Sequence, residues 1–242
     1  MINKILDNIK TLAIALIIAI LIRSLLFQPF YIPSSSMEPT LLVGDRIFVS
    51  KYTYGYSKHS FPFSPPILNN RIFNSKPDYG DLVVFKTPSD NRTDFIKRLI
   101  GLPGDEIQII DEQLFINKKK IFRNKIEISK KIRCAGSDIE VVAYEEELPN
   151  TKLHQTVYNK IGSMKNSDKY IVPDNHYFFL GDNRDCSSDS RYLNSVGYVH
   201  QNNLVGKARM IFFSNDTKEG SVLKFWNWGN SIRVTRFFKI LK

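Results

Sequence analysis

The stretch that decides the fold class is DFIKRLIGLPGD, residues 94–105. In a β-strand, successive side chains point to opposite faces. Residues 95–100 would therefore place Phe95, Lys97 and Leu99 on one face and Ile96, Arg98 and Ile100 on the other. One of these two cations is therefore expected to point towards an apolar interior, and the alternation does not say which. An edge strand that exposes both cations is the alternative.

Short runs of β-branched and aromatic residues recur on both sides of this stretch, separated by turn residues. They predict strands at residues 46–50, 82–86, 95–100, 106–110, 113–117, 138–143, 176–180 and 204–213. The dipeptides Asp111-Glu112 and Asn117-Lys118 follow apolar runs and predict hairpin turns. Little helical periodicity remains beyond Gln28, so the predicted fold class is mainly β.

Two segments look like excursions from the main sheet. Residues 52–77 contain four prolines and several tyrosines, which is typical of a long irregular loop. Residues 118–169 are richer in charge, with lysines at 118–120 and glutamates at 145–147, and predict a separate small subdomain.

The N-terminal region contains an uncharged apolar run, TLAIALIIAILI, at residues 11–22. This run alone is too short to span a membrane, because twelve helical residues reach only ~18 Å against a hydrocarbon core of ~30 Å. A span is predicted if it extends from Ile5 to Phe27, with Lys10 and Arg23 reaching opposite interfaces.

A cleaved secretory signal has a similar outline but should end in small residues of the A-x-A type. Here LLFQP follows instead, at residues 25–29, so we expect an uncleaved anchor. Lys4 and Lys10 precede the apolar run and favour a cytoplasmic N-terminus, with the body of the protein on the other side of the membrane.

The formal net charge of +10 fits binding to nucleic acid, binding to an anionic membrane surface, or solubility alone. No zinc-finger spacing or helix-turn-helix pattern is recognisable, so a nucleic-acid partner is not expected. The stretch 225–239 mixes large aromatic residues with cations. This mixture is typical of a membrane-surface segment or of a final strand with solvated lysines, and both interpretations remain open.

The most unusual segment is FYIPSSSMEPTLLVGD, residues 30–45. Pro33 and Pro39 enclose three consecutive serines and favour a stiff extended chain that would hold the hydroxyls still. Ser36 follows Phe27 by nine residues, so it lies within ~30 Å of the end of the apolar segment. The segment is either a catalytic serine loop next to lipid or a polar juxtamembrane linker.

A serine hydroxyl needs a base to become a nucleophile. There is no G-x-S-x-G motif, and the four histidines, at positions 59, 154, 176 and 200, lie in no distinctive pattern, so a structural or surface role is expected for each. A lysine can act instead when burial lowers its pKa, and Lys97 is the best candidate.

A third polar segment is FLGDNRDCSSDSRY, residues 179–192. Its three aspartates lack the ligand spacing of an EF-hand loop, so no metal site is expected. Charge-assisted pairs such as Asp189 with Arg191 would brace a loop beside a site, and an exposed polar turn is the alternative.

Taken in order, the segments at residues 30–45, 79–105 and 174–213, about half of the chain, closely resemble the bacterial type I signal peptidases, a family of Ser/Lys peptidases. The resemblance implies that Ser36 is the nucleophile and Lys97 the general base. It gives Ser34 Oγ and the backbone N–H of Ser36 the role of oxyanion donors, and it gives Ser187 the role of orienting Lys97.

The resemblance also implies supporting positions. The structural ion-pair positions are Asp182, Arg98, Asp189 and Arg191. Shallow apolar pockets for small substrate residues would be lined by Phe30, Ile32 and Ile96. The sequence departs from the family pattern at Cys186, where asparagine is common, and after Tyr192, where the link to the next glycine is longer.

The implied architecture is a signal-peptidase-like β-sheet catalytic domain with an inserted small cap subdomain and one N-terminal transmembrane helix. The expected divisions are 1–28 for a cytoplasmic stub and anchor, 29–117 and 171–242 for the catalytic domain, and 118–170 for the cap. No role is assigned to the cap.

The implied activity is removal of signal peptides from exported preproteins, after small residues of the A-x-A type and through an acyl-enzyme, without a metal or organic cofactor. The implied location is the bacterial inner membrane, crossed once, with the catalytic domain on the extracytoplasmic side and in contact with membrane lipid.

Two other interpretations remain open. Another Ser/Lys peptidase on a similar scaffold, such as a processing protease linked to conjugation or a self-cleaving repressor, would share the chemistry, although 35 mostly apolar residues before Ser36 cannot hold a repressor's DNA-binding domain. An inactive membrane-tethered β module would instead place Lys97 in solvent. The sequence does not decide whether Cys134 and Cys186 pair.

Overall fold

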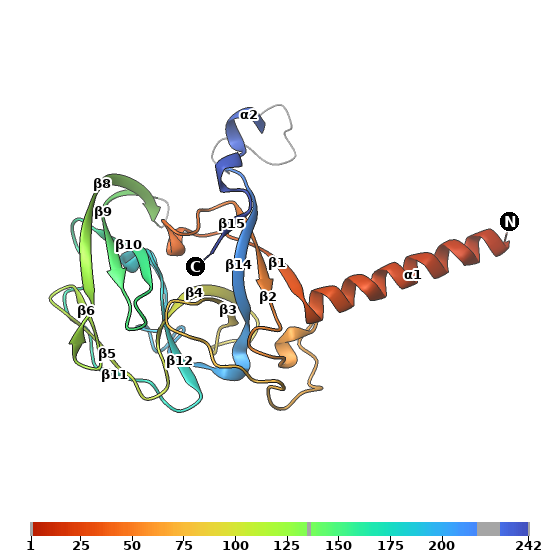
Figure 1. Cartoon of the computed structure of the whole chain (residues 1–242), viewed down its shortest axis with the longest axis horizontal. Helices are drawn as coiled ribbons and strands as arrows, with labels where there is room; N and C mark the ends of the chain where they lie inside the picture. The colour runs from red at the N-terminus through yellow and green to blue at the C-terminus, as the bar shows by residue number, and fades with distance from the viewer. Residues whose placement is uncertain (1, 135–136, 217–227, 242) are drawn as a thin grey trace.

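A long apolar helix projects from a body whose regular structure consists mainly of β-strands (Figure 1). The computed structural model describes residues 2–134, 137–216 and 228–241. The helix, α1, runs from Ile2 to Leu25, and its stretch Lys4–Leu25 has a mean hydropathy of 2.2 and an 18-residue apolar window that is not buried in the body. Its 22 residues would extend ~33 Å, which is enough to cross a membrane.

The predicted span to Phe27 is wrong at its C-terminal end. Strand β1 (Phe27–Tyr31) begins only two residues after the helix ends, because Phe27 pairs with Ser50 of β2 (Asp45–Ser50). Leu26 alone connects the helix to the main sheet.

The main sheet is antiparallel, and its order is β1-β2-β14-β3-β4-β12-β13, with β15 (Lys239–Ile240) added beside β14. The remaining strands are β3 (Leu82–Lys86), β4 (Asp94–Gly101), β12 (His176–Leu180), β13 (Val199–His200) and β14 (Leu204–Ser214). One core cluster of this sheet includes Ile47, Val49, Val84, Ala208 and Ile211.

Strand β4 is an inner strand, paired with β3 on one side and β12 on the other. Both of its central cations are buried, with Lys97 4% and Arg98 3% exposed. The expectations that only one of them points inward, or that both lie on an edge strand, are therefore wrong. Packed structure covers both faces of this strand, so each cation needs its own partner.

Two smaller sheets lie beside the main sheet (Figure 1). One has the order β11-β5-β6-β7, formed by β11 (Tyr170–Ile171), β5 (Glu106–Ile110), β6 (Gln113–Ile116) and β7 (Lys119–Lys120). The other has the order β10-β9-β8, formed by β10 (Leu153–Asn159), β9 (Ser137–Glu147) and β8 (Phe122–Cys134).

The predicted hairpin turns are confirmed, because Asp111, Glu112, Asn117 and Lys118 all have positive φ between paired strands. The predicted strands are also confirmed, and those at 82–86, 106–110 and 176–180 match to the residue. Strands β1, β8 and β10 and the two-residue strands β7, β11 and β13 were not predicted.

Short helical turns connect the strands: η1 (Ser35–Met37), η2 (Lys58–Ser60), η3 (Arg184–Cys186), η4 (Gln201–Asn203), η6 (Val234–Arg236) and α2 (Trp228–Ser231). In the C-terminal stretch singled out from the sequence, residues 225–227 lie outside the described residues. The part that follows forms α2, η6 and β15.

Candidate active site

Ser36 lies at the centre of η1, the helical turn that follows β1. Apolar residues fix this turn on the sheet, because Met37 is 1% exposed and Leu41 is fully buried in the main core. The backbone N–H of Asn183 donates to the Ser36 carbonyl at 3.1 Å. The serine is therefore held from two sides, and it is itself buried.

Lys97 approaches Ser36 from strand β4. Its Nζ lies 2.6 Å from Ser36 Oγ, and it stands 5.4 Å from the centre of the Phe95 ring. Burial lowers the pKa of Lys97 to about 8, an effect that Asp189 and Asp182 oppose and Arg191 reinforces. A substantial fraction of the amine is therefore neutral near physiological pH and can accept the proton of the serine hydroxyl.

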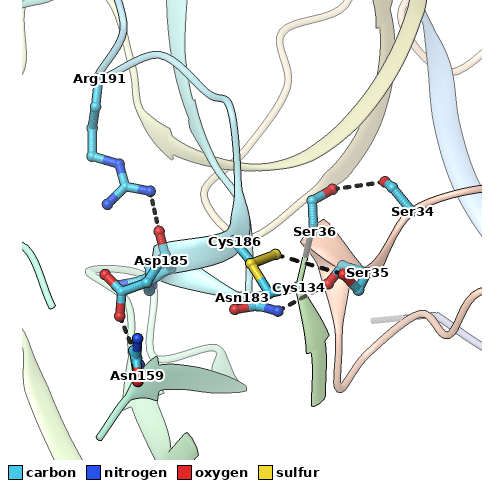
Figure 2. The surroundings of a disulfide bond; sticks show 10 residues. Ser34, Ser35, Ser36, Cys134, Asn159, Asn183, Asp185, Cys186 and Arg191 are labelled. Carbon is cyan, nitrogen blue, oxygen red and sulfur yellow. Dashed lines mark hydrogen bonds between the residues drawn. A yellow bond between two sulfur atoms is a disulfide. The ribbon is translucent and has the colours of Figure 1, made fainter. Parts of the chain in front are cut away.

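The two other serines predicted to take part differ in their surroundings. Ser34 is exposed, and its Oγ is 3.3 Å from Ser36 Oγ (Figure 2). Ser187 is buried in the loop that follows η3, where its hydroxyl helps to lower the pKa of the Asp189 carboxyl, and none of the hydrogen bonds of the described residues joins it to Lys97.

The predicted ion-pair residues form two buried bidentate pairs. Arg98 binds Asp182 through two contacts of 2.8 Å, and Thr40 Oγ1 donates to the same carboxylate at 2.5 Å. Arg191 binds Asp189 at 2.8 and 2.9 Å. Burial acts to raise the pKa of each carboxyl, but the facing arginine outweighs it and the net pKa is lowered. Both aspartates therefore stay charged in the interior.

Two cavities adjoin the serine loop. The first, of about 430 Å³, is lined by Ser36 and Lys97 together with the predicted pocket residues Phe30, Ile32 and Ile96. The second is larger, about 1190 Å³, and is lined by Ser34, Ser35, Cys186, Ser187 and part of β8, among others. Pro33, Ser34, Cys186 and Ser188 line both cavities, so together the two cavities provide space along the serine loop for an extended chain.

A disulfide that the sequence left undecided joins Cys134, the last residue of β8, to Cys186 in η3 (Figure 2). Cys186 Sγ lies 3.7 Å from Ser35 Oγ, and Asn183 Nδ2 donates to the Ser35 carbonyl at 3.2 Å. The smaller β8-β9-β10 sheet is thus fastened directly to the loop that faces the serine.

Gly181 is another residue that the sequence analysis missed. A Cβ at this position would lie 2.3 Å from Ser187 Oγ and 2.6 Å from the Ser36 carbonyl oxygen, so no larger residue fits without displacing the site. A glycine placed directly after a run of large apolar strand residues, FFLG at 178–181, was the available signal.

The arrangement supports acyl transfer. It contains a hydroxyl, a buried amine of lowered pKa within hydrogen-bonding distance, and a second hydroxyl close by. Among the described residues, no group of three or more His, Cys, Asp or Glu side chains is placed to hold a metal ion.

Comparison with known proteins adds independent information. The family described as "Signal peptidase, peptidase S26" matches residues 5–213. Proteins named signal peptidase I from Rickettsia conorii and Rickettsia prowazekii are 42% and 41% identical to this chain, over 95% of its length and over 90% and 91% of their own. A crystal structure of a signal peptidase I from Enterococcus faecalis is 28% identical, covering 55% of this chain and 97% of its own, with a TM-score of 0.32. The sequence matches include all of the segments that carry the candidate site residues.

Proposed function

Because this chain belongs to the signal peptidase family, peptidase S26, and is thus a serine endopeptidase that removes signal peptides from preproteins, we propose that Ser36 is its nucleophile and Lys97 its general base. The observation that carries the proposal is the 2.6 Å separation of Lys97 Nζ from Ser36 Oγ inside the protein. An inactive module with Lys97 in solvent is disfavoured by the same observation.

The proposed reaction begins with neutral Lys97, which takes the proton of Ser36 as Oγ attacks the scissile carbonyl carbon. The carbonyl oxygen becomes negatively charged and is stabilised by the Ser34 hydroxyl and the Ser36 backbone N–H. Protonated Lys97 then gives its proton to the leaving amine, which frees the mature protein and leaves the signal peptide as an ester on Ser36. Lys97 next deprotonates a water, which hydrolyses the ester and restores the hydroxyl.

We assign the two cavities to the two sides of the cut. The 430 Å³ cavity, lined by Phe30, Ile32 and Ile96, takes the residues before the cleaved bond and favours small A-x-A side chains. The 1190 Å³ cavity, which adjoins the first at Ser34, takes the first residues of the mature protein. Both sides suit an extended substrate held by backbone hydrogen bonds.

The buried pairs Arg98–Asp182 and Asp189–Arg191 stabilise the structure around the site and do not take part in the reaction. We propose that Ser187 orients Lys97 once substrate is bound. The same proposal treats residues 29–117 and 171–242 as the catalytic domain and 118–170 as an inserted cap.

The chain is compatible with membrane anchoring through α1. We propose that α1 crosses the bacterial inner membrane with its N-terminus in the cytoplasm, which places the serine loop near the extracytoplasmic surface.

The test is cleavage of a preprotein in detergent by the variants Ser36→Ala and Lys97→Ala. Each is expected to lower kcat/KM on the order of 10⁴-fold or more while leaving thermal unfolding cooperative. Ser89→Ala and Lys119→Ala replace exposed residues of the same types away from the site and serve as controls expected to keep full activity. Retained cleavage by either site variant would refute the assignment.

A further inference from the structure

A cavity of about 400 Å³ lies where α1 meets the main sheet, and neither Ser36 nor Lys97 lines it. Its walls come mainly from the end of α1, from β1, from the loop that follows β2 and contains η2, and from the turn between β3 and β4. The η2 loop is held against the helix end, because Tyr56 Oη donates to the Leu25 carbonyl at 3.0 Å and Lys51 N donates to the Leu26 carbonyl at 2.9 Å. The cavity therefore lies at the base of α1.

The cavity carries an excess of positive charge. Its charged lining residues are the cations Arg23, Lys51, Lys58, Lys86 and Arg92 and the carboxylates Asp90 and Asp94.

Both carboxylates are already engaged. Asp94 pairs with Lys86 at 2.9 Å, and Asp90 accepts hydrogen bonds from Thr87 and Thr93 at 2.5 Å and from backbone N–H groups. In the described part of the chain, no carboxylate lies within 4.0 Å of a charged nitrogen of the four remaining cations, Arg23, Lys51, Lys58 and Arg92.

Two side chains that line the cavity, Lys51 and His59, are buried and still lack a hydrogen-bond partner for one polar group each. Lys51 is 2% exposed, and its Nζ donates to the carbonyls of Ser60 at 2.6 Å and His59 at 3.4 Å, which leaves one of its three donors unused. His59 is 4% exposed, and its Nε2 has no hydrogen-bond partner among the described residues. Buried groups of this kind are normally satisfied, so a ligand is indicated.

The electrostatics agree with this geometry. Burial, followed by the nearby Arg23, lowers the pKa of Lys51 to about 8, and Asp94 opposes this effect only in part. Burial, followed by Lys58 and other nearby cations, lowers the pKa of His59 to about 4. An anion in the cavity would oppose both effects, because it favours the charged forms of the surrounding cations.

The rim of the cavity is apolar and aromatic. Phe61, Pro62 and Phe63 line it, and the Phe63 side chain is fully exposed. Ile67 and Phe73, in the same loop, are also largely exposed. Aromatic side chains beside cations at the end of an apolar helix are typical of the membrane–water interface. A free anion in solution would gain nothing from such a rim.

We propose that this cavity binds the phosphate of an anionic phospholipid headgroup at the surface of the membrane that α1 enters. Lys58, Arg92 and Arg23 receive the phosphate oxygens, Lys51 and His59 satisfy their remaining polar atoms at the back of the cavity, and the Phe61–Phe63 rim contacts the acyl region. Lysine and arginine are the side chains that bind phosphate most strongly in proteins.

The test titrates phosphatidylglycerol into the full-length protein in an uncharged detergent, with bound lipid counted by native mass spectrometry and phosphatidylcholine titrated in parallel. The site variant is Lys58→Gln with Arg92→Gln, which replaces accessible cations. The matched control is Lys119→Gln with Lys120→Gln, which removes the same charge from the exposed strand β7. No substrate is present, so the result does not depend on the proposed catalytic residues.

We expect the wild type and the control to bind phosphatidylglycerol more tightly than phosphatidylcholine. The site variant should bind phosphatidylglycerol on the order of 30-fold more weakly and phosphatidylcholine unchanged. Equal loss in both double variants, or no loss in the site variant, would overturn the proposal. Displacement of the lipid by inorganic phosphate at equal concentration would identify a small-anion site instead and would also overturn it.

Discussion

Lys97 shows how a strand can deliver a reactive amine without a specialised loop. The residue lies within β4 and reaches Ser36 from a position that is almost completely shielded from water. Desolvation makes the charged amine unfavourable, and the aspartates Asp182 and Asp189 oppose that effect only in part because each is paired with its own arginine. Burial thus gives an ordinary lysine the lowered pKa that the proposed base needs.

The pH dependence of cleavage follows from this environment. Lys97 acts as a base only when neutral, and its pKa is lowered to about 8, so kcat/KM should rise with pH and reach half of its maximum near pH 8. The measurement is the pH–rate profile on a preprotein, with circular dichroism at each pH to exclude unfolding. A rate that peaks under acidic conditions would contradict the role of Lys97.

Strand β4 carries side chains of the candidate site on both of its faces. Lys97 faces the serine loop, and its neighbour Arg98 faces Asp182, which follows strand β12. Arg98 also donates to the Gly80 carbonyl at 2.8 Å. Strand β4 therefore positions Lys97, the proposed base. Through Arg98 it also connects the segment before β3, at Gly80, to the segment after β12, at Asp182.

The Arg98–Asp182 pair predicts a specific pattern of stabilities. Asp182→Leu leaves the Arg98 charge buried without its carboxylate and should lower the free energy of unfolding by about 3–5 kcal/mol. The double variant Arg98→Met with Asp182→Leu should recover a large part of this loss, because no unpaired charge remains. Urea unfolding in detergent provides the measurement. A double variant less stable than the single one would contradict this expectation and show that Arg98 stabilises the protein through partners other than Asp182, such as the Gly80 carbonyl.

The strands could be predicted from local pattern because β-branched and aromatic runs between turn residues are local signals, as at residues 82–86 and 176–180. Strand β1 was missed because its apolar residues merge with the helix before it, and Pro29 interrupts the run. The burial of both Lys97 and Arg98 could not be predicted either, since their partners lie 61 and 84 residues away along the chain.

For the candidate site, the sequence supplied the residue types and the resemblance supplied their roles. The pairing of Cys134 with Cys186 depends on how β8 lies against η3, which no local pattern reveals. The same holds for the cavity at the base of α1, whose cations come from three separate parts of the chain.

Across the whole molecule, the disulfide is the covalent link between the β8-β9-β10 sheet and the loop beside Ser36. Hydrogen bonds reinforce this attachment, since Asn159 N donates to Asp185 at 2.7 Å and Val157 N donates to the Asp182 carbonyl at 2.9 Å. The small sheet therefore helps to determine where Ser187 and its neighbours lie.

Removing the disulfide should affect both stability and activity. The double variant Cys134→Ala with Cys186→Ala opens a loop of 52 residues, for which chain entropy gives a loss of about 4 kcal/mol. Displacement of the Ser187 loop should also lower kcat/KM, on the order of 10-fold or more. Thermal unfolding and preprotein cleavage measure the two effects. Dithiothreitol should reproduce them in the wild type and change nothing in the variant; equal activity of the oxidised and reduced wild type would contradict the positioning role.

The single-residue connection between α1 and β1 has a mechanical consequence. With Leu26 alone between the helix and a paired strand, the body has little freedom to rise or tilt relative to the end of the helix. When α1 crosses the bilayer as proposed, Ser36 is held at one height above the lipid. The enzyme then selects the cleavage site by its distance from the membrane. A bond is cut only when the polar segment between the apolar helix of the signal sequence and that bond is long enough to reach Ser36.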